Sequence, residues 1–155
     1  MSLPGAWGRA LLVAAVAVAA DQAVKALVLA SLKTGESINV FYGLDITLVR
    51  NDGVAFGALG GGGPLILVLV LASVTLLLAY FARHARDRLL WLPVGAILGG
   101  AVGNLIDRMR IGKVIDFIDP IAWPAFNLAD VFIVLGVAGF VLLILSEGNE
   151  ASAAG

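Results

Sequence analysis

Two aspartates lie in apolar surroundings in the C-terminal half of the chain, and their carboxyl groups are the best candidates for chemistry. Asp116 stands within "VIDFI", and Asp130 stands between Ala129 and Val131 with no basic residue within four positions. Loss of contact with water raises the pKa of a carboxyl group, and a second carboxyl nearby raises one of the two further. Two acids that share one proton can activate water and polarise a peptide carbonyl, as in aspartic proteases. The residues alone leave a second interpretation open, in which each acid only makes structural hydrogen bonds.

Other aspartates in or near apolar segments have basic neighbours, which favour supporting roles. Asp21 has Lys25 four positions further on, one helical turn away, and this spacing predicts a structural ion pair. Asp107 has Arg108 and Arg110 beside it, which favours a structural or substrate-orienting role over a catalytic one.

The composition favours a membrane protein and excludes several other kinds of site. Of the 155 residues, 61% are hydrophobic and 14% are charged, and the mean hydropathy is +1.02. Soluble domains have about 45–50% apolar and about 25% charged residues. The chain has no Cys, which excludes disulfides, thiolate ligands and Cys nucleophiles, and its one His, His84, lies in the basic stretch "RHARDR". The "HExxH" motif of zinc proteases is absent, and a net charge of −1 does not indicate nucleic-acid binding.

Four apolar runs are predicted to be the helices that position the acids. Crossing about 30 Å of hydrocarbon takes about 20 helical residues, and a backbone in lipid must satisfy its own hydrogen bonds. The runs cover about residues 11–32, 65–82, 89–106 and 128–145. We therefore expect a mainly α membrane protein, a four-transmembrane-helix bundle with a small outward β element, in a single domain over residues 1–155.

The first run has a second possible interpretation. "RALLVAAVAVAAD" resembles a secretory signal with cleavage after Ala20. The apolar pattern resumes at Ala23 and continues to Leu32, which is longer than a signal needs and favours an uncleaved first helix.

Basic residues predict the orientation of the bundle. Arg9 precedes the first helix, and the short connection between the second and third helices is rich in arginine: Arg83, Arg86 and Arg88. The positive-inside rule then predicts cytoplasmic N- and C-termini. The two longer connections, about residues 37–57 and 108–125, are expected to face outward. The first has β-branched and aromatic residues on either side of Gly43 and predicts a strand pair, whereas the second is predicted to be a loop.

Glycines in the third run indicate how it packs. Gly95, Gly99 and Gly103 recur every four residues and form a smooth stripe on a helix. Small residues let membrane helices approach closely, so this stripe predicts a helix–helix contact.

Five short blocks resemble, in order and spacing, the bacterial lipoprotein signal peptidases, also called signal peptidase II. They are "DQAVK" at 21–25, "RNDGVAFG" at 50–57, "GGAVGNLIDR" at 99–108, "VIDF" at 114–117 and "FNLAD" at 126–130. The resemblance covers almost the whole chain. It implies an intramembrane aspartic endopeptidase with four helices and an outward, periplasmic or extracellular β-cradle. Such an enzyme removes signal peptides from diacylglyceryl-modified prolipoproteins and cleaves immediately before the lipidated Cys.

The same resemblance implies roles for single residues. Asp116 and Asp130 correspond to the catalytic dyad, and Asn51 and Arg108 to residues that hold the substrate backbone. The other residues implied at the substrate cleft are Asn104, Asn127, Gly53, Ala55 and Phe56. The supporting residues it implies are Asp21, Lys25 and Asp107. Two features depart from the family pattern: the dyad is separated by a shorter segment than in many relatives, and Val131 stands where Ser is frequent.

The resemblance also implies the partners and the location. The expected partners are prolipoproteins with a lipidated Cys, membrane lipids and the inhibitor globomycin. No metal or organic cofactor is expected. The protein is expected to act as a monomer in the bacterial cytoplasmic membrane, with its active site toward the outer face.

Two other classes of function compete with a peptidase. A proton-coupled transporter or channel subunit would also bury acids, and a structural or chaperone-like membrane protein would use them only for contacts. A proton relay is disfavoured because the acids cluster toward one side and residues 65–81 hold no charge. A serine protease of the membrane is disfavoured because Ser73 has no His at membrane depth.

Overall fold

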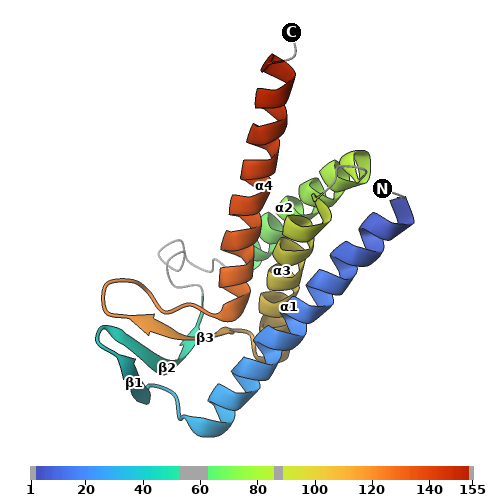
Figure 1. The fold of residues 1–155 in the computed structure, drawn as a ribbon. Coiled ribbons are helices and arrows are strands. Elements are labelled where there is room, and N and C mark those ends of the chain that lie inside the picture. Colours follow the sequence, from blue (N-terminus) through green and yellow to red (C-terminus); the bar gives the residue numbers. More distant parts are fainter. Residues whose placement is uncertain (1–2, 53–62, 86–88, 154–155) are drawn as a thin grey trace.

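The computed structural model describes residues 3–52, 63–85 and 89–153, which form four long helices and one three-stranded sheet (Figure 1). The helices are α1 (Leu3–Ser31), α2 (Gly63–His84), α3 (Trp91–Ile111) and α4 (Leu128–Ala153). The strands are β1 (Ser37–Phe41), β2 (Leu44–Asn51) and β3 (Val114–Pro120). The sheet lies at one end of the helices, and the start of α1 and the end of α4 lie at the other (Figure 1).

Long apolar helices confirm the membrane class. Within the described ranges, three helical stretches are long and apolar enough to cross a membrane: Gly5–Ser31, Leu67–His84 and Leu128–Ser146. Helix α3 is not among them, because four glycines and polar residues such as Asn104 and Asp107 lower its hydropathy. The fourth span therefore stays a prediction.

Helix α3 packs between α1 and α4, and its glycines make this possible. A Cβ atom on Gly95 would lie 2.5 Å from the carbonyl oxygen of Ala10 in α1, and Gly99 also faces α1. Gly100 faces the other way, against the backbone of Ala129 in α4. The predicted packing stripe is confirmed on the α1 side, and Gly100, one position beyond Gly99, allows close contact with α4.

The sheet is antiparallel, in the order β1-β2-β3, and packs against α1. The predicted strand pair is confirmed as β1 and β2, with the turn at Gly43, whose φ of +84° suits a residue without a side chain. Side chains that bury one face of the sheet against α1 are Val28, Leu48, Ile115 and Phe117.

The predicted outward loop over residues 108–125 is wrong for most of its length. Helix α3 continues to Ile111 and ends at Gly112, whose φ is +73° and whose N–H donates to the carbonyl of Arg108. Strand β3 then occupies Val114–Pro120 and pairs with β2. Its first four residues are all buried, so this strand lacks the polar–apolar alternation that marks a half-exposed strand.

Candidate active site

Asp116 lies in the middle of β3, opposite Val49 of β2, and its side chain is buried. Its Oδ2 accepts a hydrogen bond from Asn51 Nδ2 at 2.8 Å, and its Oδ1 accepts one from Asn127 Nδ2 at 2.7 Å. Among the described side chains, none of the ion pairs involves Asp116. Neutral amides therefore take the place of water around this carboxylate.

Burial raises the pKa of Asp116 to about 6. The hydrogen bonds from Asn51 and Asn127 oppose this rise because they stabilise the charged form, and the nearby charge of Asp130 adds to it. The carboxyl group therefore exchanges its proton close to neutral pH, where a general acid or base is most effective.

Asp130 lies in the first turn of α4 and caps that helix together with Asn127. Asn127 Oδ1 accepts the backbone N–H of Asp130 at 3.0 Å, and Asp130 Oδ2 accepts the backbone N–H of Asn127 at 3.2 Å. This reciprocal arrangement is a capping box built from Asn and Asp. The other carboxylate oxygen of Asp130 accepts a hydrogen bond from Asn104 Nδ2 at 2.8 Å.

Asn127 brings the two acids together. Its side chain donates to Asp116, and its backbone N–H donates to Asp130, so both carboxylates are held by one residue. That residue stands just before the N-terminus of α4, whose first-turn N–H groups favour negative charge. The structure thus gathers both acids of the predicted dyad around one buried amide.

A second buried group, the charged cluster, consists of two acids and one base: Asp21, Asp107 and Lys25. Lys25 Nζ lies 2.8 Å from Asp21 Oδ2 and 2.6 Å from Asp107 Oδ2, and it donates to Asn104 Oδ1 at 3.2 Å. The three protons of the ammonium group thus have three acceptors. The predicted pair of Asp21 with Lys25 is present, whereas Asp107 pairs with Lys25 and not with the neighbouring Arg108 or Arg110.

Each acid of the charged cluster also accepts a backbone N–H. Asp21 Oδ1 accepts that of Ala129 at 2.9 Å, in the first turn of α4. Asp107 Oδ2 accepts that of Ile115 at 3.2 Å, next to Asp116 in β3. The charged cluster therefore holds in place the two segments that carry the catalytic candidates.

Gln22 was missed by sequence reasoning although it lies inside the "DQAVK" block. Its Nε2 lies 3.2 Å from Asp21 Oδ2, 3.0 Å from Asp107 Oδ1 and 3.2 Å from the carbonyl oxygen of Gly103. One amide thus ties α1 to α3. A polar residue between Asp21 and Lys25 in an apolar run was the available signal.

Asn104 connects the charged cluster to the amide-bound acids. Its Oδ1 accepts from Lys25 and, at 3.0 Å, from Asn127, while its Nδ2 donates to Asp130. Every polar atom of this buried side chain is in use. Asn104, which is expected at the substrate cleft, thus makes hydrogen bonds within the protein at both of its polar side-chain atoms.

The remaining predicted substrate-binding residues lie at the edge of this network or outside the described residues. Arg108 is half-buried, and its Nη1 donates to the carbonyl oxygen of Asn104 at 3.3 Å. Gly53, Ala55 and Phe56 lie outside the described residues.

Comparisons with known proteins identify the family. The family model described as signal peptidase (SPase) II matches residues 13–146. The chain belongs to the signal peptidase II family. The lipoprotein signal peptidase of Syntrophomonas wolfei is 44% identical over 145 residues, covering 93% of this chain and 95% of that protein. The lipoprotein signal peptidase of Halothermothrix orenii is 41% identical over 128 residues, covering 82% of this chain and 88% of that protein.

Solved structures agree with the family assignment. Two bacterial membrane enzyme structures match with TM-scores of 0.82 and 0.78, at 30% and 32% identity. They cover 92% and 90% of this chain, and the chain covers 91% and 92% of them. Membership of signal peptidase II makes the protein a membrane peptidase, which removes the transporter and structural alternatives.

Proposed function

We propose that this signal peptidase II is an aspartic endopeptidase that removes signal peptides from diacylglyceryl-modified prolipoproteins, cleaving on the N-terminal side of the lipidated Cys. The observation that carries the proposal is the pair of acids, Asp116 and Asp130, held by Asn127 where β3 meets α4. Within the described residues, no group of three or more His, Cys, Asp or Glu side chains is arranged to hold a metal. The proposed reaction needs only water and the substrate.

In the proposed mechanism the two acids share one proton and act on opposite sides of the same peptide bond. The ionised carboxylate takes a proton from water, whose oxygen then bonds to the scissile carbonyl carbon. The protonated acid donates a hydrogen bond to the carbonyl oxygen and stabilises the charge that develops there. Transfer of the proton to the amine nitrogen breaks the C–N bond, which releases the signal peptide as a carboxylate and the lipidated Cys as a free amine.

The apolar surfaces of the helices suit a lipidated substrate. An apolar groove with a cavity volume of about 830 Å³ lies between α2, α3 and α4, and its lining includes Leu77, Ile97 and Phe140. Only Ser73 and Tyr80 contribute polar side-chain atoms to it. In the proposal, acyl chains stay among such apolar side chains while the peptide reaches the acids at the sheet end of the bundle.

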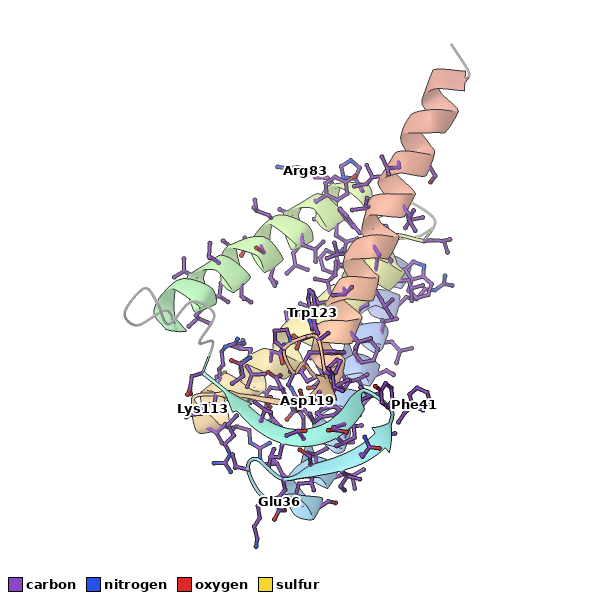
Figure 2. The ribbon with its side chains drawn as sticks, turned by 90° about the vertical axis from the view of Figure 1, so that its left-hand side faces the viewer. Glu36, Phe41, Arg83, Lys113, Asp119 and Trp123 are labelled. Carbon is purple, nitrogen blue, oxygen red and sulfur yellow. The ribbon has the colours of Figure 1, made fainter. Side chains whose placement is uncertain are left out.

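The same proposal includes an orientation. Helix α3 would be the fourth span, with both termini in the cytoplasm and the sheet at the outer face of the cytoplasmic membrane. Arg83, at the end of α2, lies at the opposite end of the molecule from the sheet (Figure 2). Arginine at that end agrees with the positive-inside rule. The proposed working unit is a monomer.

The decisive experiment replaces each acid by its amide, which keeps the shape and removes the acidity. Asp116→Asn and Asp130→Asn are each expected to lower cleavage of a purified diacylated prolipoprotein by a factor of about 10²–10⁴, the usual contribution of a general acid or base. Asp119→Asn is the matched control, because Asp119 lies three residues from Asp116 in the same strand. Each assay is run with and without a metal chelator.

Control and test variants must accumulate to equal levels in the membrane for the comparison to hold. Near-normal cleavage by either Asp116→Asn or Asp130→Asn would refute the dyad. Loss of cleavage by the unmodified protein when the chelator is added would refute metal-independent catalysis.

A further inference from the structure

Large apolar side chains are exposed on two connections at one end of the strands. The turn between β1 and β2 carries Phe41 and Tyr42, which are 71% and 92% exposed. The connection from β3 to α4 carries Ile121 and Trp123, which are 81% and 70% exposed. We refer to these four residues as the aromatic tip.

The two turns form one surface because they are bonded to each other. The backbone N–H of Ile121 donates to the carbonyl oxygen of Gly43 at 3.0 Å. A Cβ atom added to Gly43 would lie 3.9 Å from Ile121 Cδ1, so the isoleucine side chain lies against the glycine. The β1–β2 turn and the β3–α4 connection are therefore in direct contact.

The aromatic tip lies close along the chain to α4, one of the helices long and apolar enough to cross a membrane. Trp123 precedes α4 by a few residues, and the first half of α4 exposes Val134 and Leu135. Figure 2 shows Trp123 on the side of the sheet where α4 begins, and Glu36 on the opposite side, beside the last turn of α1. An exposed Trp on the side where α4 begins suits a sheet that lies at a membrane surface.

We propose that the aromatic tip binds the lipid bilayer at the boundary between headgroups and hydrocarbon of the leaflet next to the sheet. Trp and Tyr favour this boundary because their rings are apolar and their N–H or O–H groups reach water. Phe41 and Ile121 add apolar area without needing a hydrogen-bond partner. The sheet is thereby anchored at two points, the helical bundle and the aromatic tip.

This anchor sets the depth of the candidate active site. Ile121 is five residues from Asp116, roughly 17 Å along an extended strand. Binding of the tip to lipid holds β3 along the membrane surface and keeps Asp116 at the level where a lipidated peptide leaves the bilayer. The lipid contact itself rests on the membrane location of the protein and not on the proposed dyad. The inference that this contact keeps Asp116 at the level of the substrate rests on the proposed function.

The absence of Cys from the chain gives a direct test. The full-length variants Ile121→Cys and Tyr42→Cys are each labelled with a nitroxide and reconstituted in phosphatidylcholine–phosphatidylglycerol vesicles. Glu36→Cys is the reference for water and Leu135→Cys the reference for hydrocarbon. Electron paramagnetic resonance then measures collision of each label with oxygen, which concentrates in lipid, and with a water-soluble nickel chelate.

The labels at residues 121 and 42 are expected between the two references, with oxygen accessibility clearly above that at residue 36. Replacing Trp123 by Ser in the Ile121→Cys protein is expected to shift its label toward the water reference. A label as accessible to nickel as that at residue 36 would overturn the proposal. Shielding from both reagents, as in a protein–protein contact, would also overturn it.

Repeating the measurement with Asp116→Asn separates this inference from the proposed function. The amide variant is expected to leave the depths of the labels unchanged, because it alters the acids and not the tip. Failure of the dyad test would therefore leave the lipid contact standing. Failure of the depth test would leave the dyad standing.

Discussion

The charged cluster and the pair formed by Asp116 and Asp130 both bury carboxylates, but they differ in what replaces water. In the charged cluster, the ammonium of Lys25 touches Asp21 and Asp107 at 2.8 and 2.6 Å. Around Asp116 and Asp130, the partners are the amides of asparagines and backbone N–H groups. Both groups are hydrogen-bonded, yet among the residues that the structure describes only the first has a cation in contact with its carboxylates.

This difference separates a structural role from a chemical one. A cation in contact holds a buried carboxylate in its charged form and makes protonation costly. Amide donors stabilise the charge less, so burial can still raise the pKa, as it does for Asp116. An acid that can gain and lose a proton near neutral pH is suited to catalysis, whereas a permanently paired acid is suited to joining helices.

The largest expected effect on stability is the loss of Lys25. Lys25→Met would leave Asp21 and Asp107 buried without their cation, and breaking a buried pair in this way costs about 3–5 kcal/mol. The control is Lys113→Met, because the pair of Lys113 with Asp52 is exposed and such pairs contribute about 0–1 kcal/mol. Thermal unfolding in detergent measures both. Equal losses of stability in the two variants would mean that the charged cluster does not hold β3 and α4 in place.

The next effect is a pH dependence caused by Asp116. Because burial raises its pKa from 3.8 to about 6, the folded protein binds more protons than the unfolded chain between these values. The free energy of unfolding contributed by Asp116 must therefore fall as pH rises from about 4 to about 6 and level off above that. A shift of about two pKa units corresponds to a loss on the order of 3 kcal/mol.

Asp116→Asn isolates the contribution of Asp116 to the pH dependence of unfolding, because an amide does not titrate. The difference in free energy of unfolding, wild type minus Asp116→Asn, is expected to decrease across that pH range in denaturant titrations. A difference that stays constant from pH 4 to pH 7 would show that Asp116 has an ordinary pKa. The contrast with the charged cluster would then lose its basis.

A smaller loss is expected for Asn104, which joins the two groups. Asn104→Ala removes a donor to Asp130 and an acceptor for Lys25 and Asn127, and an unsatisfied buried polar group costs about 1–3 kcal/mol. Asn39→Ala is the control, since Asn39 is exposed although it bonds Asp45. Chemical unfolding compares the two. If Asn39→Ala costs as much as Asn104→Ala, the link between the groups is energetically unimportant.

The smallest effect concerns Arg108, whose guanidinium donates to the carbonyl oxygen of Asn104. In the proposed function its guanidinium binds the substrate backbone, so Arg108→Lys is expected to weaken prolipoprotein cleavage and globomycin binding together, each by up to about tenfold, or about 1.4 kcal/mol. Arg110→Lys, on the same helix and exposed, is the control. Unchanged globomycin affinity in Arg108→Lys would exclude this role.

Much of the fold follows from local patterns. Long apolar runs predict the helices, β-branched residues on both sides of Gly43 predict the first two strands, and the four-residue spacing of Asp21 and Lys25 predicts their ion pair. These features depend on contacts within a few positions of the chain, so a single sequence contains them. Strand β3 was missed because burial on both faces removes the alternation that distinguishes a strand from a loop.

The partners of the acids could not be predicted in the same way. Asp107 stands next to two arginines in the sequence but pairs with Lys25, which is 82 positions away in α1. Gln22 contacts Asp107 and the carbonyl of Gly103 for the same reason. Long-range contacts of this kind exist only because the glycines of α3 let α1 approach it closely.

The sequence by itself determined that this is an apolar helical chain with acids near the ends of its helices, because hydropathy and spacing are properties of neighbouring residues. The family blocks extended this to candidate residues for catalysis. Only the tertiary structure decided which carboxylates face a cation and which face amides. That choice depends on how four helices and a sheet pack, because the partners of each carboxylate come from elements far apart in the sequence.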